Sequence, residues 1–140
     1  MGFSISNAAL RLVSGAFILN SGIGKLKITP EHAAGLQSAA QQVFPQVAAW
    51  KPEQFGSRLA YTEVALGAFI LAPFVSSRLA GLALGGFSGG LVATYLKSPG
   101  MTEQDGIRPT SAGTAMAKDF WLAGISLALL FHRKKSPQKD

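Results

Sequence analysis

Residues 57–97 read SRLAYTEVALGAFILAPFVSSRLAGLALGGFSGGLVATYLK. They contain two apolar stretches, 57–75 and 78–97, and a helix of about 20 apolar residues crosses the roughly 30 Å hydrocarbon core of a bilayer. Only Ser76 and Ser77 separate the two stretches. So short a connection predicts an antiparallel hairpin of two membrane-spanning helices.

Two further stretches of similar character lie at residues 7–26 and 115–132. The last one has an uninterrupted apolar run only over 120–131, so it reaches membrane length only if Lys118 and Asp119 enter the bilayer edge. The first one contains Arg11 and no convincing cleavage site, which indicates an uncleaved span. We predict an all-α fold, an integral membrane four-helix bundle with up-down-up-down topology, in a single domain over residues 1–140.

The composition favours a lipid-embedded chain. Of the 140 residues, 48% are hydrophobic and only 14% are charged, whereas a soluble helical bundle, the alternative, needs a polar face on each helix. The sequence pI is about 10.0, but the Lys and Arg residues are scattered, without the basic stripe of a nucleic-acid surface. We therefore expect the lipid bilayer as a partner, and no nucleic acid.

Cysteine is absent from the sequence, which excludes disulfides, thiol redox pairs and thiolate metal sites. The two histidines, His32 and His132, fall near opposite membrane faces in the predicted topology, so they do not suit a bis-histidine haem within one chain. We expect no metal site and no intrinsic cofactor.

The connection between the first two spans contains a helical pattern of its own. Thr29 is a suitable N-cap, Pro30 fits the first helical position, and apolar residues recur at helical spacing until Pro45. This predicts a short amphipathic helix in the first outer loop, lying on the membrane surface with Trp50 as an interfacial anchor. Packing on the mouth of the bundle as a lid is the alternative.

Basic residues are densest beside the ends of the spans that would face inward. They are Arg11, Arg78, Arg133, Lys134, Lys135 and Lys139. The positive-inside rule then predicts a multi-pass protein of the cell membrane with both termini in the cytoplasm. Residues 27–56 and 98–114 would lie outside, and the second of these loops, rich in Gly, Pro, Ser and Thr, is expected to be mobile.

Glu63 is the strongest candidate for a functional residue, because an acid within a span costs roughly 2.5 to 3.5 kcal/mol on insertion scales and usually faces a partner or a cavity. Counting the rise along each span places a candidate polar layer at its depth. Its members are Glu63, Lys25, Asn20, Asp119 and Lys118, with Tyr61, Tyr95 and Trp121 around them. Arg11 lies too far along the membrane normal to pair with Glu63.

Two interpretations of this layer remain open. One is a structural ion-pair network, Glu63 with Lys25 and Asp119 with Lys118 or Arg58, that sets the helix register. The other is a proton or ligand site in which Glu63 titrates. The neighbouring aromatic side chains could also line a pocket for a quinone ring.

Small residues recur at every fourth position of the third span, at Gly81, Gly85 and Gly89. Such spacing lets another helix approach closely, because lipid provides no hydrophobic drive and packing must supply the association. We expect a tight helix contact inside the bundle. A homo-oligomer formed through this face is the alternative.

Several of these residues, taken in order, resemble the DoxX and DoxX-like family of small four-span membrane proteins. The resemblance covers about residues 9–131 and is carried by Arg11, Gly15, Phe17, Gly22, Lys25, Glu63, Gly67, Arg78 and Asp119. It implies a membrane subunit or partner protein of a redox or oxidative-stress system. Some members belong to thiosulfate:quinone oxidoreductases, and others associate with superoxide dismutase and a sulfurtransferase.

The resemblance implies a non-catalytic role for this chain, beside a membrane or peripheral redox enzyme, with a quinone as the one cofactor that it could bind. A small proton-coupled transporter using Glu63 is the alternative function. Four-span multidrug exporters also rely on one membrane glutamate, but theirs lies in the first span, whereas Glu63 lies in the second.

Overall fold

The computed structural model describes residues 4–98, 100–111, 113–117 and 119–132. These residues form helices and no β-strand, which confirms the all-α class. The elements are α1 (Ile5–Lys25), α2 (Pro30–Gln41), the 3-10 helix η1 (Pro45–Ala49), α3 (Pro52–Leu71), α4 (Ser77–Lys97), α5 (Thr114–Ala117) and α6 (Asp119–Leu130).

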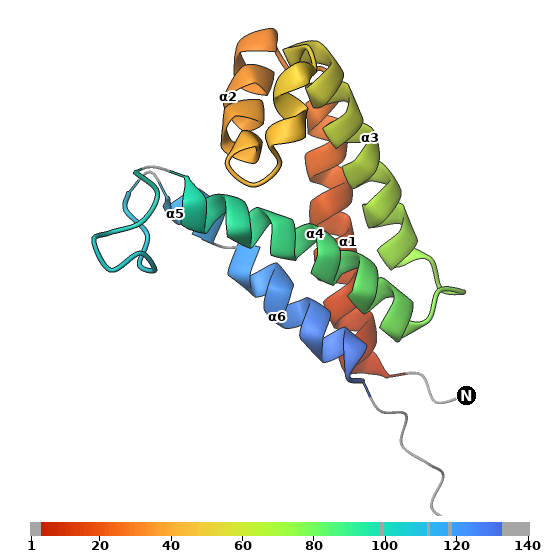
Figure 1. Cartoon of the computed structure of the whole chain (residues 1–140). Coiled ribbons are helices and arrows are strands. Elements are labelled where there is room, and N and C mark those ends of the chain that lie inside the picture. The colour runs from red at the N-terminus through yellow and green to blue at the C-terminus, as the bar shows by residue number, and fades with distance from the viewer. Residues whose placement is uncertain (1–3, 99, 112, 118, 133–140) are drawn as a thin grey trace, which may run out of the picture.

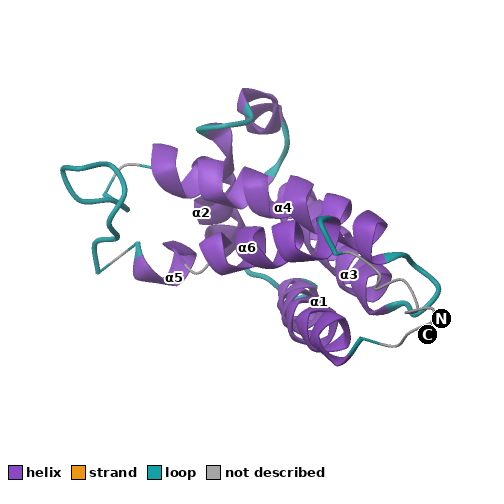
Figure 2. Ribbon diagram, turned by 90° about the horizontal axis from the view of Figure 1, so that it is seen from below, coloured by secondary structure: helices purple, strands orange, loops and turns teal. Residues whose placement is uncertain are grey.

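The helices of the four expected spans associate as two pairs (Figures 1 and 2): α1 packs along α3, and α4 packs along α6. The hairpin expected between the second and third spans is wrong in this respect, because α3 and α4 contact each other over only a few residues. They meet at the connection 72–76 and diverge from it (Figure 1). We call this the connection end of the molecule, and the opposite end, which carries α2, the α2 end.

Two of the expected spans differ from the helices observed. The second was expected over 57–75, but α3 ends at Leu71, since Pro73 has no amide hydrogen and restricts the residue before it. In the fourth, α6 covers only 12 residues, and Lys118 lies outside the described residues. By length and composition, α4 is the one helix among the described residues that suffices to cross a membrane.

Glycines bring the backbones of α1 and α3 into direct contact. A Cβ atom on Gly67 would lie 2.6 Å from the amide nitrogen of Leu19, and one on Gly22 would lie 2.6 Å from the amide nitrogen of Val64. A Cβ on Gly15 would lie 2.7 Å from the Leu71 side chain and 3.2 Å from the Gly67 carbonyl oxygen. Backbone atoms leave no space for a side chain at Gly22 and Gly67, whereas at Gly15 the Leu71 side chain would have to move. We call this contact of α1 with α3, at Gly15, Gly22 and Gly67, the α1–α3 seam.

The glycines of α4 behave differently from one another. A Cβ on Gly81 would lie 2.7 Å from the Leu130 amide nitrogen of α6, so this contact is as close as expected. At Gly85 the nearest atom is the Ser126 hydroxyl oxygen at 3.5 Å, an ordinary van der Waals distance, and Gly89 has nothing within 4 Å. The predicted close contact is therefore right for Gly81, looser at Gly85, which still faces α6, and wrong for Gly89, which is exposed. Positions four apart advance by about 400°, so each glycine is rotated by about 40° from the one before it.

Polar side chains of α1 hold the connection between the two pairs. The guanidinium of Arg11 donates to the carbonyl oxygens of Ile70 (2.8 Å), Val75 (2.6 Å) and Ala72 (2.7 Å). Carbonyls at a helix C-terminus lack intrahelical partners and carry partial negative charge, so the half-buried Arg11 guanidinium is well matched to them.

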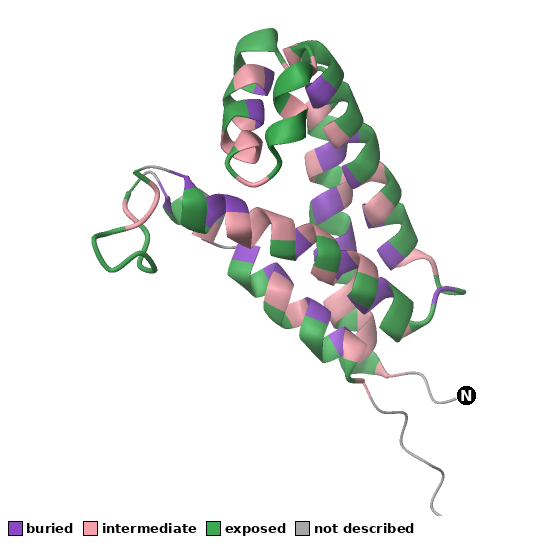
Figure 3. Ribbon diagram, in the orientation of Figure 1, coloured by how far each residue is buried: buried purple, intermediate pink, exposed green. Residues whose placement is uncertain are grey.

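One turn earlier, the amide of Asn7 donates to the Ser77 hydroxyl at the start of α4. Side chains from both pairs form one core, which comprises Ile18, Ile70, Val75, Ala80, Leu84, Leu122 and Leu129. Figure 3 shows that buried positions alternate with exposed ones along the helices of both pairs.

The connection between α1 and α3 contains the expected short helix, α2, with Thr29 as N-cap and Pro30 at the first position. It does not lie flat as a separate surface helix. Its Ala33 is fully buried, and a Cβ on Gly56 of α3 would lie 3.1 Å from the Ala33 Cβ. The lid alternative describes the packing better, since the Phe44 ring also approaches Gly90 of α4.

In the loop expected to be mobile, the described residues 100–111 are held by hydrogen bonds. Asp105 accepts from the backbone amides of Ile107 and Arg108 and pairs with the Arg108 guanidinium. These hydrogen bonds lower the pKa of Asp105 to about 2, so its carboxylate stays ionised at neutral pH. The Tyr95 hydroxyl of α4 donates to the Ile107 carbonyl at 2.8 Å and anchors the loop to the helix.

Replacement of glycine by alanine should have opposite effects on the two kinds of glycine. We expect Gly67→Ala to lower the free energy of unfolding by about 1 to 3 kcal/mol, because its methyl group overlaps backbone atoms of α1. Gly89→Ala should leave it unchanged or raise it by up to about 1 kcal/mol, because the site is open and alanine favours the helix. Denaturant unfolding of both variants in mild detergent measures this, and a loss of equal size at both positions would refute the α1–α3 seam.

Candidate functional site

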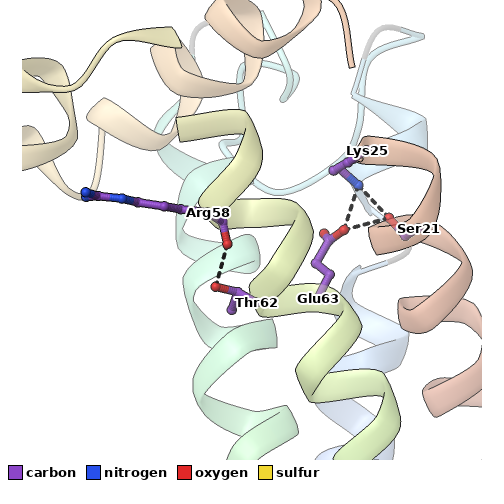
Figure 4. A network of polar contacts seen from close by, with 5 residues as sticks. All are labelled: Ser21, Lys25, Arg58, Thr62 and Glu63. Carbon is purple, nitrogen blue, oxygen red and sulfur yellow. Dashed lines mark hydrogen bonds and ion pairs between the residues drawn. The ribbon is translucent and has the colours of Figure 1, made fainter. Parts of the chain in front are cut away.

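A buried ion pair between α1 and α3 forms the candidate site (Figure 4). The Lys25 Nζ lies 2.9 Å from the Glu63 Oε2, so the pair expected from the sequence is present. The Ser21 hydroxyl donates to the same carboxylate oxygen at 3.1 Å and accepts a hydrogen bond from Lys25. Glu63 is only 5% exposed, and two donors therefore compensate its buried charge.

Local sequence explains how the three side chains meet. Ser21 and Lys25 are four residues apart on the last turn of α1, so they share one face of the helix. Gly22 lies between them against α3, and a Cβ there would come within 2.9 Å of the Glu63 Cβ. The absence of a side chain at Gly22 is therefore what admits Glu63 to the seam.

Ser21 is a site residue that the sequence analysis missed. Its spacing from Lys25 was the signal available, because a hydroxyl one turn before a lysine can share that lysine's partner.

The predicted polar layer is not one cluster. Asn20 is exposed, because the residue before Ser21 points about 100° away around the helix. Asp119 is buried at the start of α6, in the other helix pair, and Lys118 lies outside the described residues. Arg58 does not pair with Asp119, since its guanidinium stacks over the Trp50 ring.

The aromatic residues expected around Glu63 are also dispersed. Tyr61 and Trp121 are exposed on the outer faces of α3 and α6. Tyr95 is fully buried, but it packs edge-on against Phe120, with ring centroids 5.6 Å apart, at the anchored loop. An aromatic ring pocket around Glu63 is therefore not formed by these residues.

The arrangement leaves a hydrogen-bond donor for a ligand. The Lys25 ammonium lies 2.9 Å from the Glu63 carboxylate and offers donors but no acceptor. It has three N–H donors, and Glu63 and Ser21 take two of them. The third is open to an acceptor such as a carbonyl oxygen, and the Lys25 side chain is 20% exposed. Among the described residues, no group of three His, Asp or Glu side chains could hold a metal ion.

Comparison of the chain with models of protein families, with curated proteins and with solved structures gives no match. The resemblance to the DoxX family thus stays a prediction.

The ion pair can be tested by a double-mutant cycle. Lys25→Met should destabilise the protein, by less than the roughly 3 to 5 kcal/mol of a fully buried pair, because it leaves Glu63 uncompensated. Adding Glu63→Gln should recover part of this loss, measured as unfolding free energy in detergent.

Glu53→Gln, which changes an exposed acid in the first turn of the same helix, is the matched control and should have little effect. Strictly additive effects of Lys25→Met and Glu63→Gln would show that the two groups do not interact.

Proposed function

We propose that this chain is a multi-pass membrane protein with four spans, formed by α1, α3, α4 and the α5–α6 segment. The observation that carries the proposal is the set of large apolar side chains that these helices expose on their outward faces. Their outward faces carry Leu12, Val13, Phe17, Tyr61, Phe69, Leu79, Leu82, Leu96, Phe120, Trp121 and Leu127 as exposed residues. Water would not favour so many large apolar side chains on every helix, whereas lipid does.

Buried polar groups support the same proposal, because they lie within the apolar core and not on the outward faces. They are Ser14, Glu63, Ser88, Thr94, Asp119 and Ser126. In the part of the chain that the structure describes, no buried side-chain nitrogen or oxygen lacks a hydrogen bond. Helices of 20 or 21 residues, such as α3 and α1, are about 30 Å long and match the hydrocarbon thickness.

Within the membrane, the chain acts as a non-catalytic subunit or partner of a redox or oxidative-stress enzyme. Two features support this role: the sequence contains no cysteine that could carry redox chemistry, and Glu63 is held by Lys25 and Ser21. The third N–H of Lys25 suits the carbonyl oxygen of a quinone. The resemblance to the DoxX family implies both the enzyme partner and the quinone.

Purification from the native membrane in mild detergent tests this role. We expect a cofactor-bearing enzyme to co-purify in a fixed ratio, and a quinone to be retained by the wild-type chain and lost from Lys25→Met. Lys27→Gln, which changes an exposed lysine two residues further on, is the control and should retain both. A chain that purifies alone, and whose stability changes with a transported cation instead, would support the proton-coupled transporter.

Single cysteines introduced into this cysteine-free chain test the topology. With both termini in the cytoplasm, a membrane-impermeant maleimide added outside cells should label Ser38→Cys in α2 and Gln104→Cys in the loop, but not Ser6→Cys in α1. All three positions are exposed in the structure, so access and not burial decides the result. Labelling of Ser6→Cys from outside would reverse the orientation.

A further inference from the structure

Arg58 and Trp50 form a cation–aromatic pair on the surface of the α2 end. The Arg58 Cζ lies 4.3 Å from the centroid of the Trp50 ring, within the range of attraction between a guanidinium and an aromatic face. Arg58 extends away from Lys25 and Glu63 (Figure 4). Among the described residues its guanidinium makes no hydrogen bond or ion pair, so its N–H groups are open to a ligand.

The Trp50 platform is fixed by contacts on its other sides. The buried amide of Gln37 donates to the Trp50 carbonyl at 2.8 Å and to the Val47 carbonyl at 2.7 Å. The Trp50 ring also packs against buried Phe55, with centroids 6.5 Å apart. Stacking on a fixed ring restricts the guanidinium before any ligand binds, which reduces the entropy lost on binding.

Arg58 lies where the exposed face of α3 changes from polar to apolar. Lys51 and Gln54, which precede Arg58 on this face, are exposed and polar. Tyr61, Ala65 and Phe69, which follow it at helical spacing, are exposed and predominantly apolar. Tryptophan and arginine at such a boundary are typical of the lipid headgroup level.

We propose that Arg58, held on Trp50, binds the phosphodiester of a phospholipid headgroup in the leaflet at the α2 end. A planar guanidinium offers paired N–H donors that match two phosphate oxygens, which a lysine ammonium cannot do. The apolar residues below it on α3 would then lie along the acyl chains of the same lipid. This inference rests on the proposed membrane location, and not on the redox partner or the quinone.

Lipid retention tests the proposal directly. The full chain is placed in nanodiscs of phosphatidylglycerol, released into detergent, and its bound lipid is counted by native mass spectrometry. Arg58→Gln should retain less lipid by about threefold, the effect of one exposed charge-assisted contact, and Arg58→Lys should give an intermediate value. Lys27→Gln is the control for loss of one exposed positive charge at the same end, and should match the wild type.

A second measurement separates a lipid from free phosphate. Phosphatidylglycerol in mixed micelles should raise the Tm of the wild type more than that of Arg58→Gln, while inorganic phosphate at the same concentration should not. Equal lipid retention by Arg58→Gln and the wild type would overturn the proposal, and so would an equal Tm shift with inorganic phosphate. A chain that remains soluble and monomeric without detergent would instead overturn the membrane location itself.

Discussion

The arrangement of the whole molecule depends on the backbone contact between α1 and α3 at Gly15, Gly22 and Gly67. In the proposed bilayer location, helices would gain little by hiding apolar side chains from their surroundings, so close packing and polar contacts would have to hold them together. The three glycines provide the close packing, because they let the two backbones touch. This contact also positions the two charged side chains of α1, Arg11 at one end of the seam and Lys25 at the other.

The pairing of helices shows what the sequence could and could not predict. The four apolar stretches and the short helix after Thr29 were predictable, because length and periodicity report on one helix at a time. The choice of partner was not, because the two-serine connection determines only that α3 and α4 are consecutive. The partner of α3 is set by glycines in α1 that contact residues distant along the chain, Gly22 with Val64 and Gly15 with Gly67. Gly15 and Gly22 are spaced by seven residues, not four.

For the candidate site, the sequence predicted the level of each residue along its helix, but not the side of the helix to which its side chain points. Counting residues along each span placed Lys25 and Glu63 at one level, and they do pair. The same count placed Asn20 and Asp119 there, yet Asn20 turns outward and Asp119 belongs to the other helix pair. Depth follows from a constant rise per residue, whereas direction requires the rotation of each helix about its own axis. For α1 and α3, that rotation is decided by the α1–α3 seam. The sequence analysis had instead expected the close helix contact at the regularly spaced glycines of α4.

The two cations of α1, Arg11 and Lys25, determine the register of α1 along α3, which the glycines alone would leave ambiguous. Sliding α1 by seven residues along α3, about 10.5 Å, would bring Gly22 to the place of Gly15 and keep one close backbone contact. Arg11 would then leave the carbonyl oxygens of Ile70, Ala72 and Val75, and Lys25 would leave Glu63 uncompensated in a region that is 5% exposed. The second loss is the costlier one, since a buried charge without a partner is destabilising by several kcal/mol, and Arg11, which is half-buried, adds a smaller cost. The charges at the two ends therefore select a single register for α1 on α3. Because Arg11 also binds the connection 72–76, that register places α4 as well.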